Sequence, residues 1–367
     1  MKRYKLLNNV LGWVVFVIAA VTYILTLEST ASFWDCGEFI ASGYKLEVGH
    51  PPGNPIFMLT ARFFANFASS PSEVAYMVNL MSGLLSAATI LLLFWTITRL
   101  AQKIVLREGE TEETMSLGQM IAILGCGLVG ALAYAWSDTF WFSAVEGEVY
   151  AYSSFCTALV FWLILKWESV ADLPHANRYI ILIAYIIGVS IAVHLLNLLC
   201  IPAIVLVYYY RKYKNTDLKG SLIALLVSFV LIVLLLYGLV PGFVEVASWV
   251  ELLFVNVFHL PFNSGVVFYF FLIVGVIAWA IYETYAQRSD KLIKISFLIS
   301  IVLVGIPFIG DGYIIGIVLT AALAYYLFTR KKLAVVAMNT ILLSLFVIFI
   351  GYSSYALIVI RSTANTP

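Results

Sequence analysis

The chain has 367 residues, of which 63% are hydrophobic and 11% are charged, and its mean hydropathy is +1.00. Soluble domains are about half apolar and a quarter charged, so this composition excludes a single water-soluble core. A formal net charge of +1 gives no indication of nucleic acid as a partner. The apolar residues form blocks of roughly 17–25, the length that crosses about 30 Å of hydrocarbon as an α-helix.

In chain order, these blocks predict an all-α polytopic membrane protein with about eleven spanning helices. The first block follows Lys2, Arg3 and Lys5, and no small-residue cleavage site closes it, which favours an uncleaved span over a signal peptide. The predicted spans are Leu11–Leu27, Val78–Leu100, Gly118–Trp136, Ala151–Leu165, Tyr179–Asn197, Leu198–Tyr210, Ser221–Val240, Gly265–Tyr282, Ile293–Ile309, Tyr313–Phe328 and Leu333–Tyr355.

The basic residues orient these spans. If the chain crosses twice between Tyr179 and Tyr210, every basic residue except Lys45, Arg62 and Arg361 falls on one side. Because cytoplasmic loops are enriched in Lys and Arg, this pattern predicts a cytoplasmic N-terminus and an outer C-terminus. A single crossing would move the basic cluster at 211–219 to the outer side. Pro202 is a candidate site for the break between the two crossings.

Two further apolar segments are better suited to the membrane surface. Pro55–Phe67 is short and contains Arg62, and Phe243–Phe262 gathers its polar residues on one arc of a helical wheel. Both are therefore predicted as interfacial helices, the first with a re-entrant alternative. The predicted organisation is a catalytic half at 1–210 with acidic outer loops at 28–77 and 137–150, a C-terminal transmembrane half at 211–360 with the interfacial helix at 243–262, and the start of an outer segment at 361–367.

The first outer loop carries Asp35 and Glu38, which share one face if the segment is helical. Aromatic neighbours such as Trp34 reduce hydration there. Paired carboxylates in such surroundings can have their pKa values pushed apart, as acid–base chemistry requires. The alternative is a helix cap formed by Asp35 with Glu38 three residues on. Both interpretations remain open, and we take Asp35 and Glu38 as the catalytic candidates and Trp34 as a substrate contact.

Two groups of polar residues add binding candidates. Residues 49–55 form a Pro- and Gly-rich turn in which His50 can orient a substrate or shuttle a proton, with Asn54 beside it. His194 and Asn197 lie within an apolar run, where polar groups are functional candidates by default, and the outer carboxylates are their candidate partners. The alternative for either histidine is a ring satisfied by its local hydrogen bonds.

The second outer loop places Glu146 and Glu148 among aromatic residues that include Trp141 and Tyr150. Such carboxylates can hold a divalent cation or bind sugar hydroxyls while an aromatic ring stacks on the sugar. The alternative is an aromatic belt with ordinary polar caps. We predict these four residues as substrate contacts. No residue is assigned as a metal ligand, no cofactor is certain, and a divalent cation stays an open alternative.

Positive charge is scarce on the predicted outer face. A phosphate handled there would have to be met by Lys45, Arg62, Arg361, a histidine, a helix N-terminus or a cation. Because arginine binds phosphate in a bidentate manner, Arg62 and Arg361 are the candidates. Contact with lipid headgroups is the alternative interpretation of Lys45 and Arg62.

Four stretches carry a resemblance to a known family. They are SFWDCGEF at 32–39, GHPPGNP at 49–55, WSDTFWFSAVEGEVYA at 136–151 and HLLNLL at 194–199. The layout of one span followed by two acidic outer loops resembles the GT-C superfamily of polyprenyl-phosphate-dependent glycosyltransferases. The stretches resemble, more narrowly, the protein O-mannosyltransferase-like family first catalogued as a domain of unknown function. Residues 361–367 also resemble that family, which usually continues into a large outer soluble domain, so a membrane module or fragment is expected.

The resemblance implies an enzyme that moves a sugar, a mannose-like hexose, from a polyprenyl-phosphate carrier to Ser or Thr hydroxyls of exported proteins. Asp35 matches the general base, Glu38 its helper, and Glu146 or Glu148 the second acidic loop. The expected setting is the cytoplasmic membrane of a bacterium, with the site on the periplasmic face. The alternatives are a transporter or flippase of a lipid-linked or polar solute, and a non-catalytic envelope assembly factor.

Overall fold

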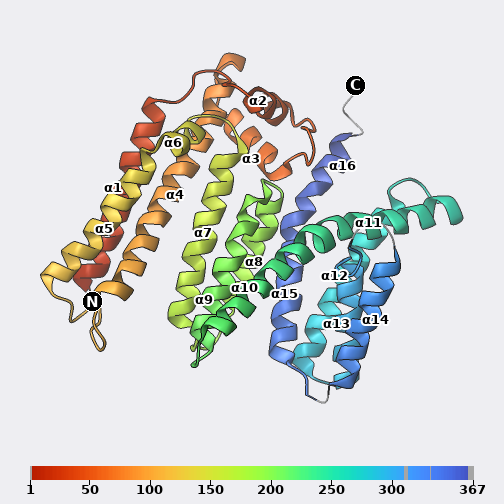
Figure 1. The fold of residues 1–367 in the computed structure, drawn as a ribbon. Helices are drawn as coiled ribbons and strands as arrows, with labels where there is room; N and C mark the ends of the chain where they lie inside the picture. Colours follow the sequence, from red (N-terminus) through yellow and green to blue (C-terminus); the bar gives the residue numbers. More distant parts are fainter. Residues whose placement is uncertain (1, 310–312, 331, 363–367) are drawn as a thin grey trace. The chain divides into compact units, whose positions relative to one another are not determined.

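The computed structural model describes residues 2–309, 313–330 and 332–362. All regular structure in these residues is helical (Figure 1), which confirms the predicted all-α class. The chain forms two compact units, residues 1–200 with 348–367 and residues 201–347. The predicted division at residue 210 concerned catalytic roles and stays a prediction. The outer segment predicted from residue 361 lies mostly outside the described residues.

The first unit is built around long helices that pack side by side (Figure 1), with short helices over their ends. The long ones are α1 Lys2–Leu25, α4 Val74–Val105, α5 Leu117–Ala135, α7 Val149–Val170 and the shorter α8 Arg178–Ile191. The short ones are α2 Cys36–Lys45, α3 Pro55–Ala65, α6 Asp138–Ala144 and α16 Ala356–Ser362, with 3-10 turns η1 Pro71–Glu73, η2 Leu195–Cys200 and η5 Ser353–Tyr355.

A cluster of buried apolar side chains fixes the loop-bearing end of this unit. Phe39 of α2, Phe57 of α3, Val78 of α4 and Val149 of α7 all belong to it. The rings of Phe39 and Phe57 meet edge to face at 5.1 Å between centroids. The segment predicted as an interfacial helix is helical as α3, and its depth in a membrane stays a prediction. This packing holds α2 and α3 against the ends of α4 and α7.

The second unit contains α9 Ile201–Lys212, α10 Leu218–Val233, α11 Val240–Leu252, α12 Ser264–Ala286, α13 Asp290–Leu303, α14 Tyr313–Thr329 and most of α15 Val335–Tyr352. A π-helical turn, η3 Leu234–Leu239, joins α10 to α11, and a second, η4 Leu253–Val257, extends α11. The helix is therefore continuous where a separate interfacial helix at 243–262 was predicted. The π turn ends two residues before Pro241 and widens the helix there, so that the proline ring is accommodated without ending it.

The chain also breaks where a break was predicted, but not at Pro202. Helix α8 ends at Ile191, a 3-10 turn follows, and Pro202 lies in the first turn of α9. A proline in that position needs no N–H bond, because the first N–H groups of a helix have no partner within it. The interruption comes instead at 192–194, where His194 leaves the helical run.

The described residues contain eight helices long and apolar enough to cross a membrane, as expected for an integral membrane protein. The other predicted spans correspond to α8, α13 and α14, which have 14, 14 and 17 residues. At about 1.5 Å per residue they reach roughly 21–26 Å, less than the hydrocarbon thickness of about 30 Å. The count of eleven crossings and the orientation of the termini therefore stay predictions.

Candidate functional site

Asp35 lies directly before α2, at the position of an N-cap, but its side chain makes no capping hydrogen bond. The preceding residue, Trp34, has a φ of 62° and is 89% exposed, so it turns the chain into the helix and points its ring outward. The cap expected as the alternative role of Asp35 is thus not formed by its carboxylate. That carboxylate is exposed at the start of the helix.

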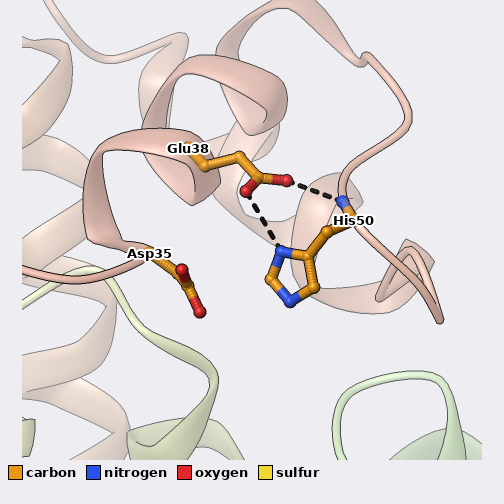
Figure 2. A group of neighbouring side chains, drawn as sticks. All are labelled: Asp35, Glu38 and His50. Carbon is orange, nitrogen blue, oxygen red and sulfur yellow. Dashed lines mark hydrogen bonds and ion pairs between the residues drawn. The ribbon is translucent and has the colours of Figure 1, made fainter.

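Glu38, one turn into α2, is bound to His50 in the following loop (Figure 2). Its Oε1 accepts a hydrogen bond from the His50 backbone N–H at 2.6 Å, and its Oε2 lies 3.1 Å from Nδ1 of the ring. The backbone bond, followed by the ring, lowers the pKa of Glu38. The loop that carries His50 turns at residues 50–53, where the Gly53 N–H donates to the His50 carbonyl at 2.8 Å. Glu38 is therefore an ionised group that fixes the imidazole.

Asp35, Glu38 and His50 form a possible metal-binding group. One ligand atom from each lies within 4.8 Å of the others, and all three side chains are exposed (Figure 2). Two carboxylates and an imidazole suit Mn²⁺ or Zn²⁺. The sequence suggested a cation at Glu146 and Glu148 instead. It did not indicate the group around His50, because the contact between Glu38 and His50 depends on a turn between residues twelve apart.

The second acidic loop packs beneath this group. Glu146 and Glu148 are 4% and 5% exposed, and the Ser32 hydroxyl donates to the carboxylate of Glu146. A tight turn between them is closed by the Glu148 N–H, which donates to the Glu146 carbonyl at 2.9 Å. A Cβ on Gly147 would lie 3.0 Å from Oδ1 of Asn79, so glycine lets the loop approach α4.

The two outer loops converge at Glu148. Burial, with added repulsion from Glu146 and Asp35, raises the pKa of Glu148 to about 7. Burial also raises the pKa of Glu146. The carboxyl groups of this site thus differ in their environments: Glu38 is held ionised by His50, while Glu148 is close to half protonated at neutral pH. This is the separation of pKa values that acid–base chemistry uses.

Asn79 is a site residue that sequence reasoning missed. It is fully buried in α4, and its Nδ2 donates to the carbonyls of Glu28 at 2.7 Å and Thr30 at 3.1 Å. The backbone N–H of Glu28 donates in turn to the Val145 carbonyl at 3.2 Å. Asn79 thereby anchors the start of the first outer loop. An asparagine within an apolar span was the available signal.

The remaining aromatic and polar candidates lie around this centre. The rings of Tyr150 and His194 are 5.5 Å apart between centroids, and Nδ1 of His194 accepts from the Leu196 N–H at 3.2 Å. Asn197 is 1% exposed, and its amide atoms have no hydrogen-bond partner among the described residues. The carboxylate partners predicted for His194 are thus replaced by Tyr150 and a local backbone bond.

Two other candidates are held at local positions. Nε1 of Trp141 donates to Oγ1 of Thr26 at 2.9 Å, which ties α6 to the segment that follows α1. Asn54 precedes α3 with a φ of 40° and is 4% exposed, so it shapes the entry to that helix. Their contacts support the loops rather than reach the carboxylate group.

Both predicted phosphate-binding arginines lie at the far end of α2. Arg361 donates from Nε to the Leu46 carbonyl at 2.6 Å, and Arg62 donates to the Tyr44 carbonyl and lies 5.2 Å from that ring's centroid. Cations are favoured at a helix C-terminus by its dipole. Because α2 has ten residues, this end is about 15 Å from Asp35. The structure does not bring these guanidinium groups to the carboxylates.

The chain was compared with known proteins. Residues 35–217, about half of the chain, match the family described as the protein O-mannosyl-transferase TMEM260 N-terminal domain. The mouse protein O-mannosyl-transferase TMEM260 is 27% identical over 209 residues, which cover 57% of this chain and 27% of the relative. The Dictyostelium discoideum protein of the same name is 23% identical over 189 residues, covering 50% and 20%. No solved structure matches.

These matches confirm the predicted resemblance to the protein O-mannosyltransferase-like family. The matched region contains every predicted site residue except Trp34, which directly precedes it, and Arg361. The chain spans about a quarter of the length of these relatives.

Proposed function

From the membership of residues 35–217 in the TMEM260 N-terminal domain family, we propose that the chain is the membrane module of a protein O-mannosyltransferase. The donor is a mannose-like hexose on a polyprenyl phosphate, and the acceptor is a Ser or Thr hydroxyl of an exported protein. Both relatives carry the name protein O-mannosyl-transferase. Both are also eukaryotic, so they give no support to the bacterial membrane expected from the sequence.

The observation that carries the proposal is the convergence of Asp35 with Glu148. Asp35 is exposed, whereas Glu38 is bound to His50 and Glu146 accepts from Ser32. In the proposed reaction the oxygen of the acceptor hydroxyl bonds to the anomeric carbon of the sugar, and Asp35 takes the proton of that hydroxyl. The bond from that carbon to the phosphate oxygen breaks, and the lipid phosphate leaves with the electron pair. A positioned base contributes about 10²–10⁴-fold, and single displacement inverts the sugar.

Glu148 suits the leaving-group side of this step. Its pKa of about 7 keeps a substantial fraction neutral at physiological pH, and a neutral carboxyl can donate a hydrogen bond to a phosphate oxygen. An ionised carboxylate there would repel the phosphate. His50 lies beside Asp35, and its ring nitrogen can donate a hydrogen bond at this site. Arg62 and Arg361, about 15 Å away along α2, are better suited to holding that helix.

The test is transfer from a labelled lipid-phosphate hexose to a Ser/Thr-rich peptide by the purified chain in liposomes. Label on the peptide supports the transferase. Movement of the labelled carrier across the bilayer without transfer would support the flippase alternative. An Asp35→Asn variant, reconstituted to the same density, is the matched control, because a flippase does not need a base for glycosyl transfer.

A further inference from the structure

A second polar site lies at the opposite end of the first unit. Helices α1, α4 and α7 enclose a cavity of about 450 Å³, lined by the first turns of α1, the last turns of α4 and the second half of α7. Asn79 of α4 is hydrogen-bonded to the first outer loop, whereas Arg99 on the same helix lines the cavity. Twenty residues of helix correspond to about 30 Å, so the two sites are separated by roughly a membrane thickness.

The cavity lining is positively charged. Lys5, Arg99 and Lys166 line it together with one carboxylate, Glu112, which lies 3.7 Å from the ammonium of Lys5. Lys166 lies 4.9 Å over the ring of Trp162, and no carboxylate in the described part of the chain is within ion-pair distance of it. Arg99 is paired with the Glu168 carboxylate at 3.6 Å. The three cations of the lining therefore exceed the two adjacent carboxylates by one, and Lys166 has no ion-pair partner among the described residues.

Two buried polar atoms in the lining have no hydrogen-bond partner among the described residues. They are the hydroxyl of Tyr4, which is 4% exposed, and Oδ1 of Asn8. The Tyr4 hydroxyl faces the side chains of Gln102 and Thr98, and neither contact has the geometry of a full hydrogen bond. A buried polar group left without a partner destabilises the folded protein. A bound ligand that accepts a hydrogen bond from Tyr4 would remove this destabilisation.

An apolar wall adjoins these polar groups. The rings of Trp95 and Trp162 lie 5.8 Å apart and are inclined by 32°, and both line the cavity. Cations, a buried hydroxyl and paired indoles in one cavity match an amphiphile with an anionic head. From these contacts we propose that the cavity binds the phosphate-bearing headgroup of a lipid with net negative charge, with Lys166, Arg99 and Tyr4 on the phosphate oxygens and hydrocarbon against the tryptophans.

This proposal is independent of the glycosyl transfer, and binding alone tests it. The full chain, purified in maltoside detergent, is titrated with short-chain phosphatidylglycerol, polyprenyl phosphate, phosphatidylcholine and inorganic phosphate, and binding is followed by native mass spectrometry and thermal unfolding. Saturable binding of either anionic lipid supports the site, and the tighter of the two identifies its source. Equal binding of phosphatidylcholine, or binding of inorganic phosphate alone, would overturn it.

Matched variants locate the binding. Lys166→Gln should weaken lipid affinity at least about tenfold, because a charge-assisted hydrogen bond is lost. Tyr4→Phe should weaken it about fivefold and leave unfolding of the unliganded protein unchanged, because the hydroxyl has no internal partner to lose. Arg178→Gln, the same charge change at an exposed position on α8, is the control. Wild-type affinity in both Lys166→Gln and Tyr4→Phe would place the lipid elsewhere.

Discussion

The two ends of the first unit lie at opposite ends of α4 and α7, and they carry side chains of opposite charge. At one end, the loop before α4 and the loop before α7 gather carboxylates around Asp35 and Glu148; at the other, the helices and the loop after α4 line a cavity with excess positive charge. The acidic end is assembled by hydrogen bonds between loops, for example from Asn79 to Glu28. The basic end is assembled by the packing of α1, α4 and α7 and by ion pairs such as that between Lys5 and Glu112 of the following loop. The two ends of the helices therefore carry opposite charge, and an apolar core lies between them.

The largest expected effect comes from removing the proposed base. Asp35→Asn should lower peptide transfer about 10²–10⁴-fold, because the acceptor proton loses its acceptor, while lipid binding at the basic end stays at the wild-type level. Initial rates with a labelled donor measure the first effect and native mass spectrometry the second. Such a result would show that Asp35 is needed for transfer at the acidic end and not for lipid binding at the basic end.

The matched control is Asp138→Asn, since Asp138 is an exposed carboxylate on α6. It should retain transfer. Wild-type rates with Asp35→Asn would show that another group takes the proton, and equal losses in both variants would indicate a general charge effect.

A cation at the acidic end gives the next largest effect. Added Mn²⁺ should bind through Asp35, Glu38 and His50 and, by occupying the proposed base, should compete with its uptake of the acceptor proton. Glu38→Gln should weaken that binding at least about tenfold by removing one ligand and freeing the imidazole. Electron paramagnetic resonance of free Mn²⁺ measures the affinity. Glu146→Gln is the control, since Glu146 is engaged by Ser32. An equally large loss of Mn²⁺ affinity in the control would indicate that the cation binds at the second acidic loop.

Glu148 should make stability fall as pH rises. Its pKa is raised from 4.5 to about 7, mainly by burial, so between these values the unfolded chain releases the proton first. The free energy of unfolding therefore decreases from pH 4.5 to about 7, by an upper bound of about 3 kcal/mol, and levels off above. Glu148→Gln should lose this dependence and unfold at a higher temperature than the wild type at pH 8.

Thermal unfolding in detergent across pH 4.5–8 measures this difference. Glu108→Gln, in an exposed loop, should follow the wild type at every pH. A constant offset between Glu148→Gln and the wild type would mean that the carboxyl does not titrate in this range.

The sequence predicts the helices well, because long apolar blocks such as Val78–Leu100 have only one stable backbone form in lipid. It also predicts that Asp35 and Glu148 belong to one site, since both occur in motifs of the same family. It does not predict that Arg361 lies on the end of α2, or that Lys166 joins a cavity. Those contacts depend on how distant segments pack, and neither periodicity nor local spacing carries that information.

The smallest expected effect tests how closely the acidic loops must pack. A Cβ at Gly147 would lie 3.0 Å from both Oδ1 of Asn79 and Cγ1 of Val78, so Gly147→Ala must shift the loop by a few tenths of an ångström. Because catalytic rates depend on such placement, transfer should fall about threefold to tenfold with little change in unfolding. Gly125→Ala on α5, where a Cβ meets nothing within 4 Å, is the matched control and should keep wild-type transfer. Equal rates for the two variants would mean that transfer at the acidic end tolerates displacement of the loop that carries Glu146 and Glu148.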